Sequence, residues 1–314
     1  MNICVIGSYA KALVMTADRI PLAGETLEGR DYRETYGGKG SDMAVQAARL
    51  GAKVGYIGVV GDDTYGREFI SLMKAEDIST DGIRVTKALA TGAGFIIKDT
   101  RARNVIVVDK GANSLFTAKD IDSNIRQIQG ADVVLAQLEI PTETALYALK
   151  RAKSLGKMTI LNPAPAVDLT GENLDFIDII TPNETEARVI VGELPDGSLT
   201  NRQISEKLLN TGCRMVVMTL GADGVDIHTK TDSRHVSAFD VKVVDSNGAG
   251  DCFNAALTVA LADGKSIGEA VNFANAASAL CCTKWETVPS YHTAKDVCAF
   301  LKNIEQLSCR KEVL

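Results

Sequence analysis

The architecture of this chain is most evident in one segment, Val243-Val244-Asp245-Ser246-Asn247-Gly248-Ala249-Gly250-Asp251-Cys252-Phe253. Its pattern predicts a strand, a glycine-rich turn and then a helix, because small residues with helical periodicity continue from Asn254 through Ala262. Glycines at such a junction let backbone N–H groups gather at a helix N-terminus, where the helix dipole also favours an anion. The segment therefore predicts a phosphate-binding turn.

An acidic residue follows this turn directly. A carboxylate at Asp251 would lie beside bound phosphate oxygens, which is electrostatically unfavourable unless the group takes part in chemistry. We therefore interpret Asp251 as a general base. The alternative is an acidic residue in the first turn of a helix that interacts only with the dipole.

The rest of the chain alternates between two patterns. Short aliphatic runs, typical of strands buried on both faces, lie at Ile3 to Ile6, Val54 to Val60, Val133 to Leu135, Met158 to Leu161, Ile177 to Thr181 and Met215 to Thr219. Helical patterns lie between them at Ser41 to Leu50, Thr64 to Ala75, Thr142 to Leu155, Glu184 to Val191 and Ile204 to Leu209. This alternation predicts an α/β fold with three layers around a doubly wound, mostly parallel sheet.

Two segments depart from that alternation. Residues 26–36 and 91–108 mix β-branched and aromatic residues with charges, which predicts antiparallel strands outside the main sheet. A small sheet of this kind could close as a lid over the strand ends where ligands bind, and an edge hairpin without gating is the alternative. We expect a single domain over residues 1–314, with a lid built from segments of about 10–36 and 91–109.

The composition limits the classes of partner and the cellular compartment that we expect for this protein. Lys and Arg number 34 against 40 Asp and Glu, a formal charge of −6, so no broad basic surface is available for nucleic acid. The seven cysteines form no CxxC spacing, which favours reduced thiols in a cytoplasm. The first residues show no leader pattern, and no apolar run is long enough to cross a bilayer. We expect a cytoplasmic protein without a membrane segment.

Two further glycine clusters could contact small ligands. Tyr36-Gly37-Gly38-Lys39-Gly40 precedes a helix that carries Asp42 and could let a small polyol approach the main chain, although a flexible turn entering a helix explains it as well. Thr219-Leu220-Gly221-Ala222-Asp223-Gly224 joins two strands and suits a nucleotide resting on exposed backbone. A plain β-turn is the alternative.

Polar residues also follow two of the predicted strands, the first of them in Asn162-Pro163-Ala164-Pro165-Ala166. Asn183 and Glu186, within Thr181-Pro182-Asn183-Glu184-Thr185-Glu186, would face the crevice at the carboxyl ends of the strands. Their oxygens suit Mg²⁺, which keeps several waters and prefers phosphates with one or two carboxylates. A helix start with a capping residue is the alternative, and both interpretations can hold together. Trp285 we assign to packing.

Taken in order, these motifs resemble the ribokinase-like family of ATP-dependent carbohydrate kinases, also called PfkB. The resemblance spans nearly the whole chain and rests on Gly7-Ser8, Pro21 through Thr26, Gly37 through Gly40, Val60 through Asp63 with Gly66, Gln137 through Glu139, Asn162 through Pro165, Pro182 through Glu186, Thr219 through Gly221, and Asp245 through Asp251. It implies transfer of the γ-phosphate of ATP to a primary hydroxyl of a pentose, hexose or related sugar, with Mg²⁺ as cofactor.

The resemblance also implies roles for individual residues. Asp251 matches the general base, and Gly248, Ala249 and Gly250 match the anion hole. The sugar would contact Gly38, Lys39, Asp42 and Glu139. Asn183 and Glu186 would hold Mg²⁺ and phosphate through water, and the nucleotide would lie on Thr219, Gly221, Gly224 and Asn275. A K⁺ site beside the anion hole is implied at Asp245, Asn247, Cys281, Lys284 and Ser290, with Glu286 in place of a loop glycine.

The pocket departs from the family pattern at the sugar. Ala10 and Ala12, with Lys11 between them, replace an Asn and an Asp that grip hydroxyls, and Asp42 replaces an Asn. The last change turns a two-way hydrogen-bonding amide into a carboxylate that only accepts. We therefore expect that ribose is not the best substrate and that a related pentose, a hexose or a substituted sugar is.

Two other functions remain open. A nucleoside kinase of the same fold is one, because Ala10 and Ala12 leave room for a base. A noncatalytic sugar sensor is the other, and the complete acid, anion-hole and magnesium pattern argues against it. We also expect a homodimer through the lid, in which Phe95, Ile96 and Ile97 bury an apolar face against a second subunit.

Overall fold

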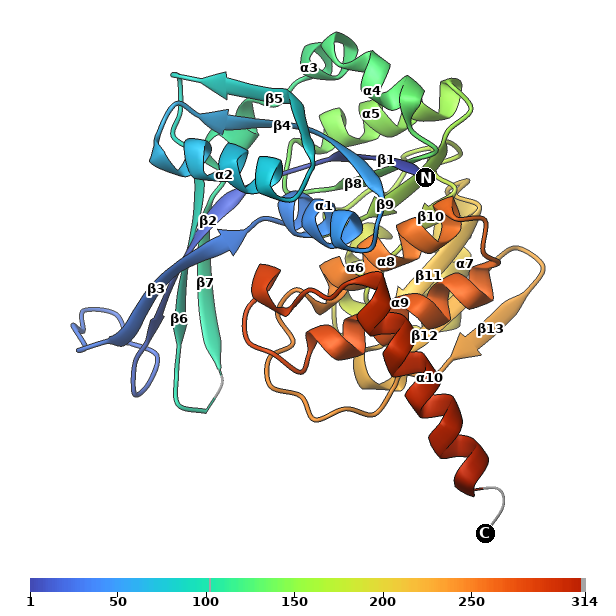
Figure 1. Cartoon of the computed structure of the whole chain (residues 1–314). Coiled ribbons are helices and arrows are strands. Elements are labelled where there is room, and N and C mark those ends of the chain that lie inside the picture. Colours follow the sequence, from blue (N-terminus) through green and yellow to red (C-terminus); the bar gives the residue numbers. More distant parts are fainter. Residues whose placement is uncertain (102, 312–314) are drawn as a thin grey trace.

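The computed structural model describes residues 1–101 and 103–311, and a nine-stranded sheet forms its centre (Figure 1). The strand order is β13-β12-β11-β10-β9-β8-β1-β4-β5, and pairing is parallel except at β11–β12 and β12–β13. The bounds are β1 Asn2–Ile6, β4 Lys53–Gly61, β5 Ser79–Thr86, β8 Val133–Gln137, β9 Met158–Asn162, β10 Ile179–Ile180, β11 Met215–Thr219, β12 Val225–His228 and β13 Ser233–Val236. The predicted mostly parallel sheet is confirmed.

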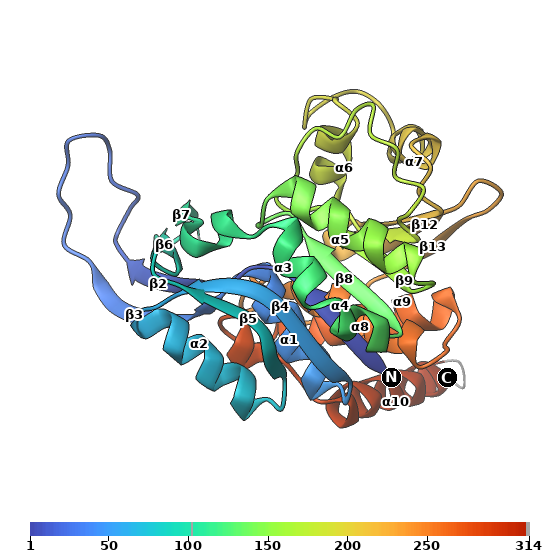
Figure 2. The same ribbon diagram turned by 90° about the horizontal axis from the view of Figure 1, so that it is seen from above.

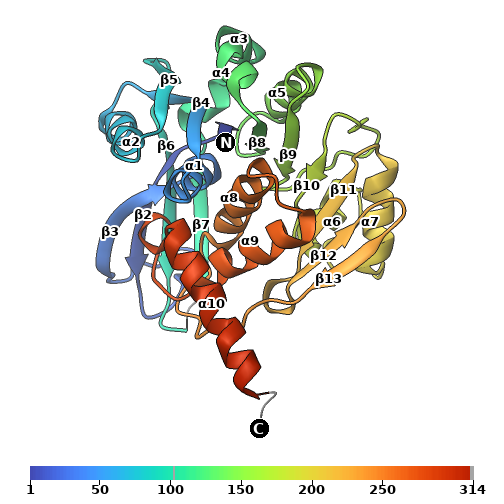
Figure 3. The ribbon, with the colours of Figure 1, turned by 45° about the vertical axis from the view of Figure 1, so that its right-hand side comes forward.

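Helices cover both faces of this sheet (Figure 3). One apolar core joins it to α1 (Lys39–Arg49), α2 (Thr64–Ala75), α8 (Ala249–Ala262), α9 (Ile267–Cys281) and α10 (Ala294–Lys311). The second core joins the opposite face to α3 (Ala118–Ser123), α4 (Ile125–Gly130), α5 (Thr142–Ser154), α6 (Glu184–Ile190) and α7 (Asn201–Asn210). Short 3₁₀ turns lie at Gly111–Leu115, Gly221–Asp223 and Val288–Ser290. The three-layer prediction is confirmed.

A separate four-stranded sheet projects from one side of the molecule (Figures 1 and 2). It consists of β2 (Ala10–Thr16), β3 (Arg30–Gly37), β6 (Gly92–Lys98) and β7 (Asn104–Asp109), in the order β3-β2-β6-β7. We call it the lid sheet. The expected antiparallel pairing is confirmed for β2–β3 and β6–β7, but β2 and β6 pair in parallel. The chain enters both strands from the main sheet, so they run in the same direction.

Two strand predictions also need correction. Val243 and Val244 lie in an irregular segment, where the backbone N–H of Val244 donates to Cys282 O at 2.8 Å and Val243 stays 61% exposed. The aliphatic run at 177–181 contains only the two-residue strand β10. Val244 bonds to the C-terminal end of α9 and forms no strand, whereas Asp178 and Thr181 bond to β9 on either side of the short strand β10, so apolar composition alone overstates the length of both strands.

The connections bring distant segments to one end of the sheet. β1 leads into β2 of the lid sheet, β3 leads back into α1, and α1 packs against α8. The N-termini of α1 and α8 are therefore placed close together beneath the lid sheet.

Among the described residues, no helix is both long and apolar enough to span a bilayer.

Candidate active site

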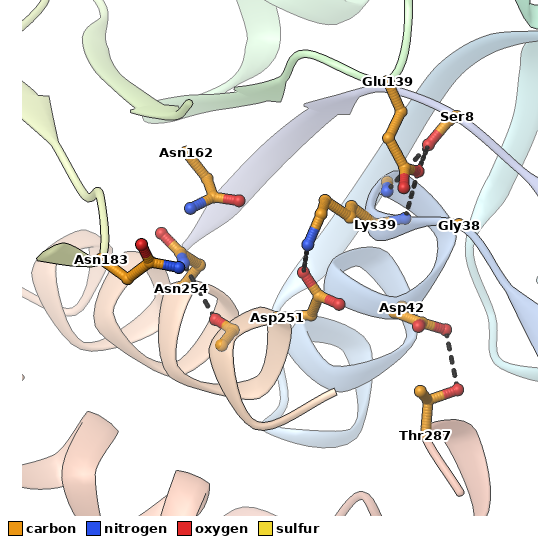
Figure 4. Close-up of polar contacts among 12 residues, drawn as sticks. Ser8, Gly38, Lys39, Asp42, Glu139, Asn162, Asn183, Asp251, Asn254 and Thr287 are labelled. Carbon is orange, nitrogen blue, oxygen red and sulfur yellow. Dashed lines mark hydrogen bonds and ion pairs between the residues drawn. The ribbon is translucent and has the colours of Figure 1, made fainter. Parts of the chain in front are cut away.

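A cavity lies between the lid sheet and the N-termini of α1 and α8. Its floor includes Gly38, Lys39, Asp42, Glu139 and Asp251, five residues that the sequence analysis selected. The lid strands line the wall with apolar residues, among them Ala10, Ala12, Val14, Ile96, Ile106 and Val108, and with the charged residues Lys11, Arg33 and Lys98. Figure 4 shows the Lys39 side chain pointing toward Asp251, Glu139 pointing toward Ser8 and the backbone of Lys39, and Asp42 pointing toward Thr287.

Asp251 lies in the first turn of α8 and is only 8% exposed. Gly248 precedes the helix with φ 77°, and a Cβ there would lie 2.9 Å from the Tyr291 hydroxyl, so glycine is required at this position. Burial raises the pKa of Asp251 from 3.8 to about 6, Glu139 and Glu186 add to the shift, and Lys39 opposes it. The carboxylate is thus tuned toward proton exchange near neutral pH.

Lys39 is the positive charge closest to this carboxylate in the cavity. Its Nζ lies 3.7 Å from Asp251 Oδ1, an ion-pair distance that is too long for a hydrogen bond. The Asp251 charge, followed by those of Glu139 and Glu186, raises the pKa of Lys39, so the ammonium stays charged. Its backbone N–H donates to Glu139 Oε2 at 2.8 Å, and the Ser8 hydroxyl donates to the same oxygen. Glu139 is therefore held in one orientation.

Asp42 is the third carboxylate of the floor and is 2% exposed. Burial raises its pKa well above the usual range, and the charges of Asp251 and Glu139 raise it further. Its side chain accepts a hydrogen bond from the Thr287 hydroxyl at 3.2 Å. Three carboxyl groups thus lie around Lys39, and the lid strands add Lys11, Arg33 and Lys98 to the same lining.

The predicted anion-hole amides are only partly available. The Ala249 N–H donates to Ser246 O at 3.2 Å, so this amide has an intramolecular partner. Gly250 has open space where a Cβ would lie. The backbone N–H groups of Gly250 and Asp251 belong to the first turn of α8, where helices leave amides unpaired.

The predicted magnesium residues Asn183 and Glu186 follow β10, and Thr219 ends β11, whereas Gly224 precedes β12 and Asn275 lies on α9. Asn183 and Glu186 form a reciprocal capping box at the start of α6, with bonds of 2.8 and 2.9 Å. Asn183 also bridges to Thr219. Burial raises the pKa of Glu186, and the Lys39 charge opposes this shift.

The nucleotide loop has the predicted strand–turn–strand form. Thr219 ends β11, Gly221 and Gly224 have φ values of 59° and 104°, and Gly224 precedes β12. Asn275 on α9 donates to Ser237 O at 3.1 Å, which ties the neighbouring loop to the helix. Within residues 1–101 and 103–311, no three His, Cys, Asp or Glu side chains cluster to hold a metal by themselves.

The structure joins residues of two sequence motifs to a further residue, Asn254, in a chain of hydrogen bonds. Asn162 donates to Thr181 O at 2.9 Å, the Thr181 hydroxyl donates to Asn254 Oδ1 at 2.5 Å, and Asn254 donates to Gly250 O at 2.9 Å. This chain of bonds connects β9, the end of β10 and the first turn of α8. Asn254 had only a helical periodicity in the sequence, so nothing marked it as a partner of the turn.

The implied K⁺ site does not fit the residues present. Asp245 accepts from the Asn247 N–H at 3.1 Å with Oδ1, and Oδ2 lies 3.3 Å from both Lys98 Nζ and the Glu286 N–H. The Cys281 thiol contacts Ser290 Oγ at 3.1 Å. A thiol and the Lys284 ammonium are poor ligands for a hard cation, and Asp245 already has a positive partner.

A doubly wound sheet with a lid and a buried carboxylate at a helix N-terminus defines a class of enzymes that phosphorylate small alcohols. The chain belongs to the pfkB family of carbohydrate kinases, whose model matches residues 1–294. It is accordingly an ATP-dependent phosphotransferase, as the sequence analysis expected.

Individual relatives agree with this assignment. The chain is 42% identical over 279 residues to "Ribokinase" of Bacillus subtilis, covering 89% of this chain and 92% of the relative. It is 37% identical over 302 residues to "Ribokinase" of Haemophilus influenzae, covering 96% and 99%. The solved structure of Arabidopsis thaliana ribokinase complexed with ribose and ATP matches with a TM-score of 0.85 and 29% identity, covering 96% and 98%. These names do not support the expectation that ribose is not the best substrate.

Proposed function

We propose that this protein transfers the γ-phosphate of ATP to the primary hydroxyl of ribose or a closely related pentose. The observation that carries the proposal is the buried carboxylate of Asp251 at the N-terminus of α8, in one cavity with Lys39, Asp42 and Glu139. The names of the relatives favour ribose as the acceptor. The cavity combines apolar residues with several polar groups, a lining that suits a small polyhydroxylated ligand such as a pentose.

Asp251 would act as the general base. Its pKa of about 6 leaves the group ionised at neutral pH and close enough to that pH to accept a proton from the attacking hydroxyl. The unpaired amides in the first turn of α8 would stabilise charge on the transferring phosphoryl group, and Lys39 lies on the same side. Catalysis would rest on positioning and electrostatics, without a covalent intermediate.

Asn183 and Glu186 would hold the magnesium ion of the nucleotide through water. Magnesium would neutralise charge on the β- and γ-phosphate oxygens. Their capping box fixes both side chains at the crevice, close enough to Lys39 for the charges to influence one another. Thr219, Gly221, Gly224 and Asn275 would support the nucleotide beside them.

A panel of acceptors tests the proposal. ADP release is measured with Mg²⁺–ATP and D-ribose, 2-deoxyribose, fructose, glucosamine or adenosine, and the product is identified by mass. We expect the highest kcat/KM with a pentose. A highest value with adenosine would instead support a nucleoside kinase, and tight sugar binding without ADP release would support a sensor.

The outer face of the lid sheet supports a homodimer. Pairing of β2, β6 and β7 places Leu13, Met15, Phe95, Ile97, Val105 and Val107 on one face. Phe95 is 57% and Val107 64% exposed, so a second copy would remove a large apolar area from water. Ile96 was expected on this face, but it lines the cavity instead, because side chains alternate along a strand.

The proposal also places the enzyme in the cytoplasm. ATP is available there, and the described cysteines, including buried Cys4, Cys213, Cys252 and Cys281, are free thiols.

A further inference from the structure

A lysine of the lid sheet contacts the loop that supports the anion hole. Lys98 ends strand β6, and its Nζ lies 3.3 Å from Asp245 Oδ2. The two side chains are only 16% and 8% exposed, so the pair is largely removed from water. Asp245 stands three residues before Gly248, the residue that precedes α8. The contact therefore joins the lid sheet to the turn beneath the proposed phosphoryl position.

The other Asp245 contacts organise the same turn. Oδ1 accepts the backbone N–H of Asn247 at 3.1 Å, inside the glycine-rich segment. Oδ2 accepts the backbone N–H of Glu286 at 3.3 Å. A carboxylate with two backbone donors and no cation would leave a buried negative charge next to a site that must receive phosphate. The Lys98 ammonium supplies the opposite charge.

Lys98 is also held in place from its other side. Its Nζ lies 5.5 Å from the centre of the Trp285 ring, within the range of a cation–π contact. Trp285 was assigned to packing, yet its side chain is 56% exposed, so burial does not account for it. The Trp285 ring and the Asp245 carboxylate together form a binding site for one ammonium group.

The neighbouring residue makes a second bridge to the lid sheet. Glu286 has φ 70°, a left-handed conformation that is unfavourable for a residue with a side chain. Its carboxylate pairs with Arg33 Nε of β3 at 2.9 Å. Two charged contacts therefore hold the lid sheet in this position: β3 is joined to Glu286, and β6 is joined to Asp245.

We propose that the Lys98 ammonium takes the place of a bound monovalent cation at Asp245, so that the anion-hole turn is neutralised when the lid sheet occupies this position. Lys98 is thus a positioning residue that acts on phosphoryl transfer through Asp245. The enzyme then needs no added monovalent cation, and lid position and anion-hole charge are coupled. This inference goes beyond the proposed function and rests on it only for the activity readout.

The first test compares cations and variants in the ADP-release assay at constant ionic strength. We expect equal wild-type rates in KCl, NaCl and tetramethylammonium chloride. Lys98→Met should lower kcat by about 10- to 100-fold with little change in the KM for ATP, a typical size for coupling between sites. K⁺ or methylammonium should restore part of the rate, and tetramethylammonium should not. Lys98→Arg retains the charge and should keep most activity.

Lys87→Met is the matched control, because the Lys87 side chain is 89% exposed and remote from Asp245. A second readout needs no turnover: the unfolding midpoint of the ligand-free chain is measured in K⁺ and in tetramethylammonium. We expect no difference for wild type and a higher midpoint in K⁺ for Lys98→Met. If Lys98→Met does not fold, the cation dependence of the wild-type rate and the activity of Lys98→Arg still test the proposal. Several-fold activation of wild type by K⁺, or a Lys98→Met enzyme with normal kcat, would overturn the proposal.

Discussion

Replacing Asp251 with asparagine should remove most turnover and stabilise the fold at neutral pH. The amide keeps the shape of the carboxylate but cannot accept the proton, so we expect kcat to fall by about 10²- to 10⁴-fold. The stability effect follows from burial. The pKa of Asp251 rises from 3.8 to about 6 on folding, a shift of about 2 units or about 3 kcal/mol.

The sign of the stability effect is fixed by proton binding. Between the two pKa values the folded state holds the proton more tightly than the unfolded state, so this group's contribution to stability falls as pH rises through about 4 to 6. Relative to Asp251→Asn, wild type should lose about 2 kcal/mol between pH 4.5 and pH 8. Exposed Asp240 offers a matched substitution, Asp240→Asn, which should show no such difference.

Urea unfolding at the two pH values and steady-state ADP release provide the measurements. Near-normal kcat in Asp251→Asn would remove the residue from the role of base. A stability difference between wild type and variant that does not change with pH would show that burial does not raise the pKa of this carboxyl. Either result would refute the reasoning from burial to chemistry.

Three further changes test neighbouring parts of the site. Lys39→Met should move the acid limb of the pH profile of kcat/KM above about pH 6, because Lys39 lowers the pKa of Asp251. Lys39→Arg keeps the charge and should leave the limb in place. An unchanged limb in both variants would contradict the pairing of Lys39 with Asp251. Glu186→Gln should raise the Mg²⁺ concentration needed for half-maximal rate by about 10-fold with an unchanged unfolding midpoint, because glutamine can still complete the capping box. Val107→Glu should convert the dimer to a monomer in sedimentation runs, and a wild-type monomer at micromolar concentration would count against the interface.

The sequence predicted most of the fold because its signals were local. Buried aliphatic runs and helical periodicity gave the main sheet, and the predicted helix over 64–75 has the bounds observed for α2. The lid sheet was located and the antiparallel pairing within β2–β3 and β6–β7 was expected, but the parallel pairing of β2 with β6 was not, because it joins residues about 80 positions apart in the sequence. Such a pairing depends on chain connections that no short pattern contains.

The cavity floor was predicted for a similar reason. Gly38, Lys39 and Asp251 stand in glycine-rich turns whose chemistry is visible in the sequence. Lys98 was not predicted, because a lone lysine at the end of a strand resembles any surface lysine. Its partner Asp245 lies 147 residues away and becomes apparent only when the lid sheet is folded against the loop.

The two ends of the β2–β3 hairpin have a consequence for engineering. β2 begins two residues after Ser8, which holds Glu139, and β3 ends next to Gly38, where φ is 93° and a Cβ would lie 2.8 Å from Ala10 N. The two points at which the hairpin joins the rest of the chain therefore both lie next to the cavity floor. The hairpin is therefore not a transplantable module: grafting it from a homologue would import part of the acceptor pocket with it, and chimaeras should inherit the donor's sugar preference.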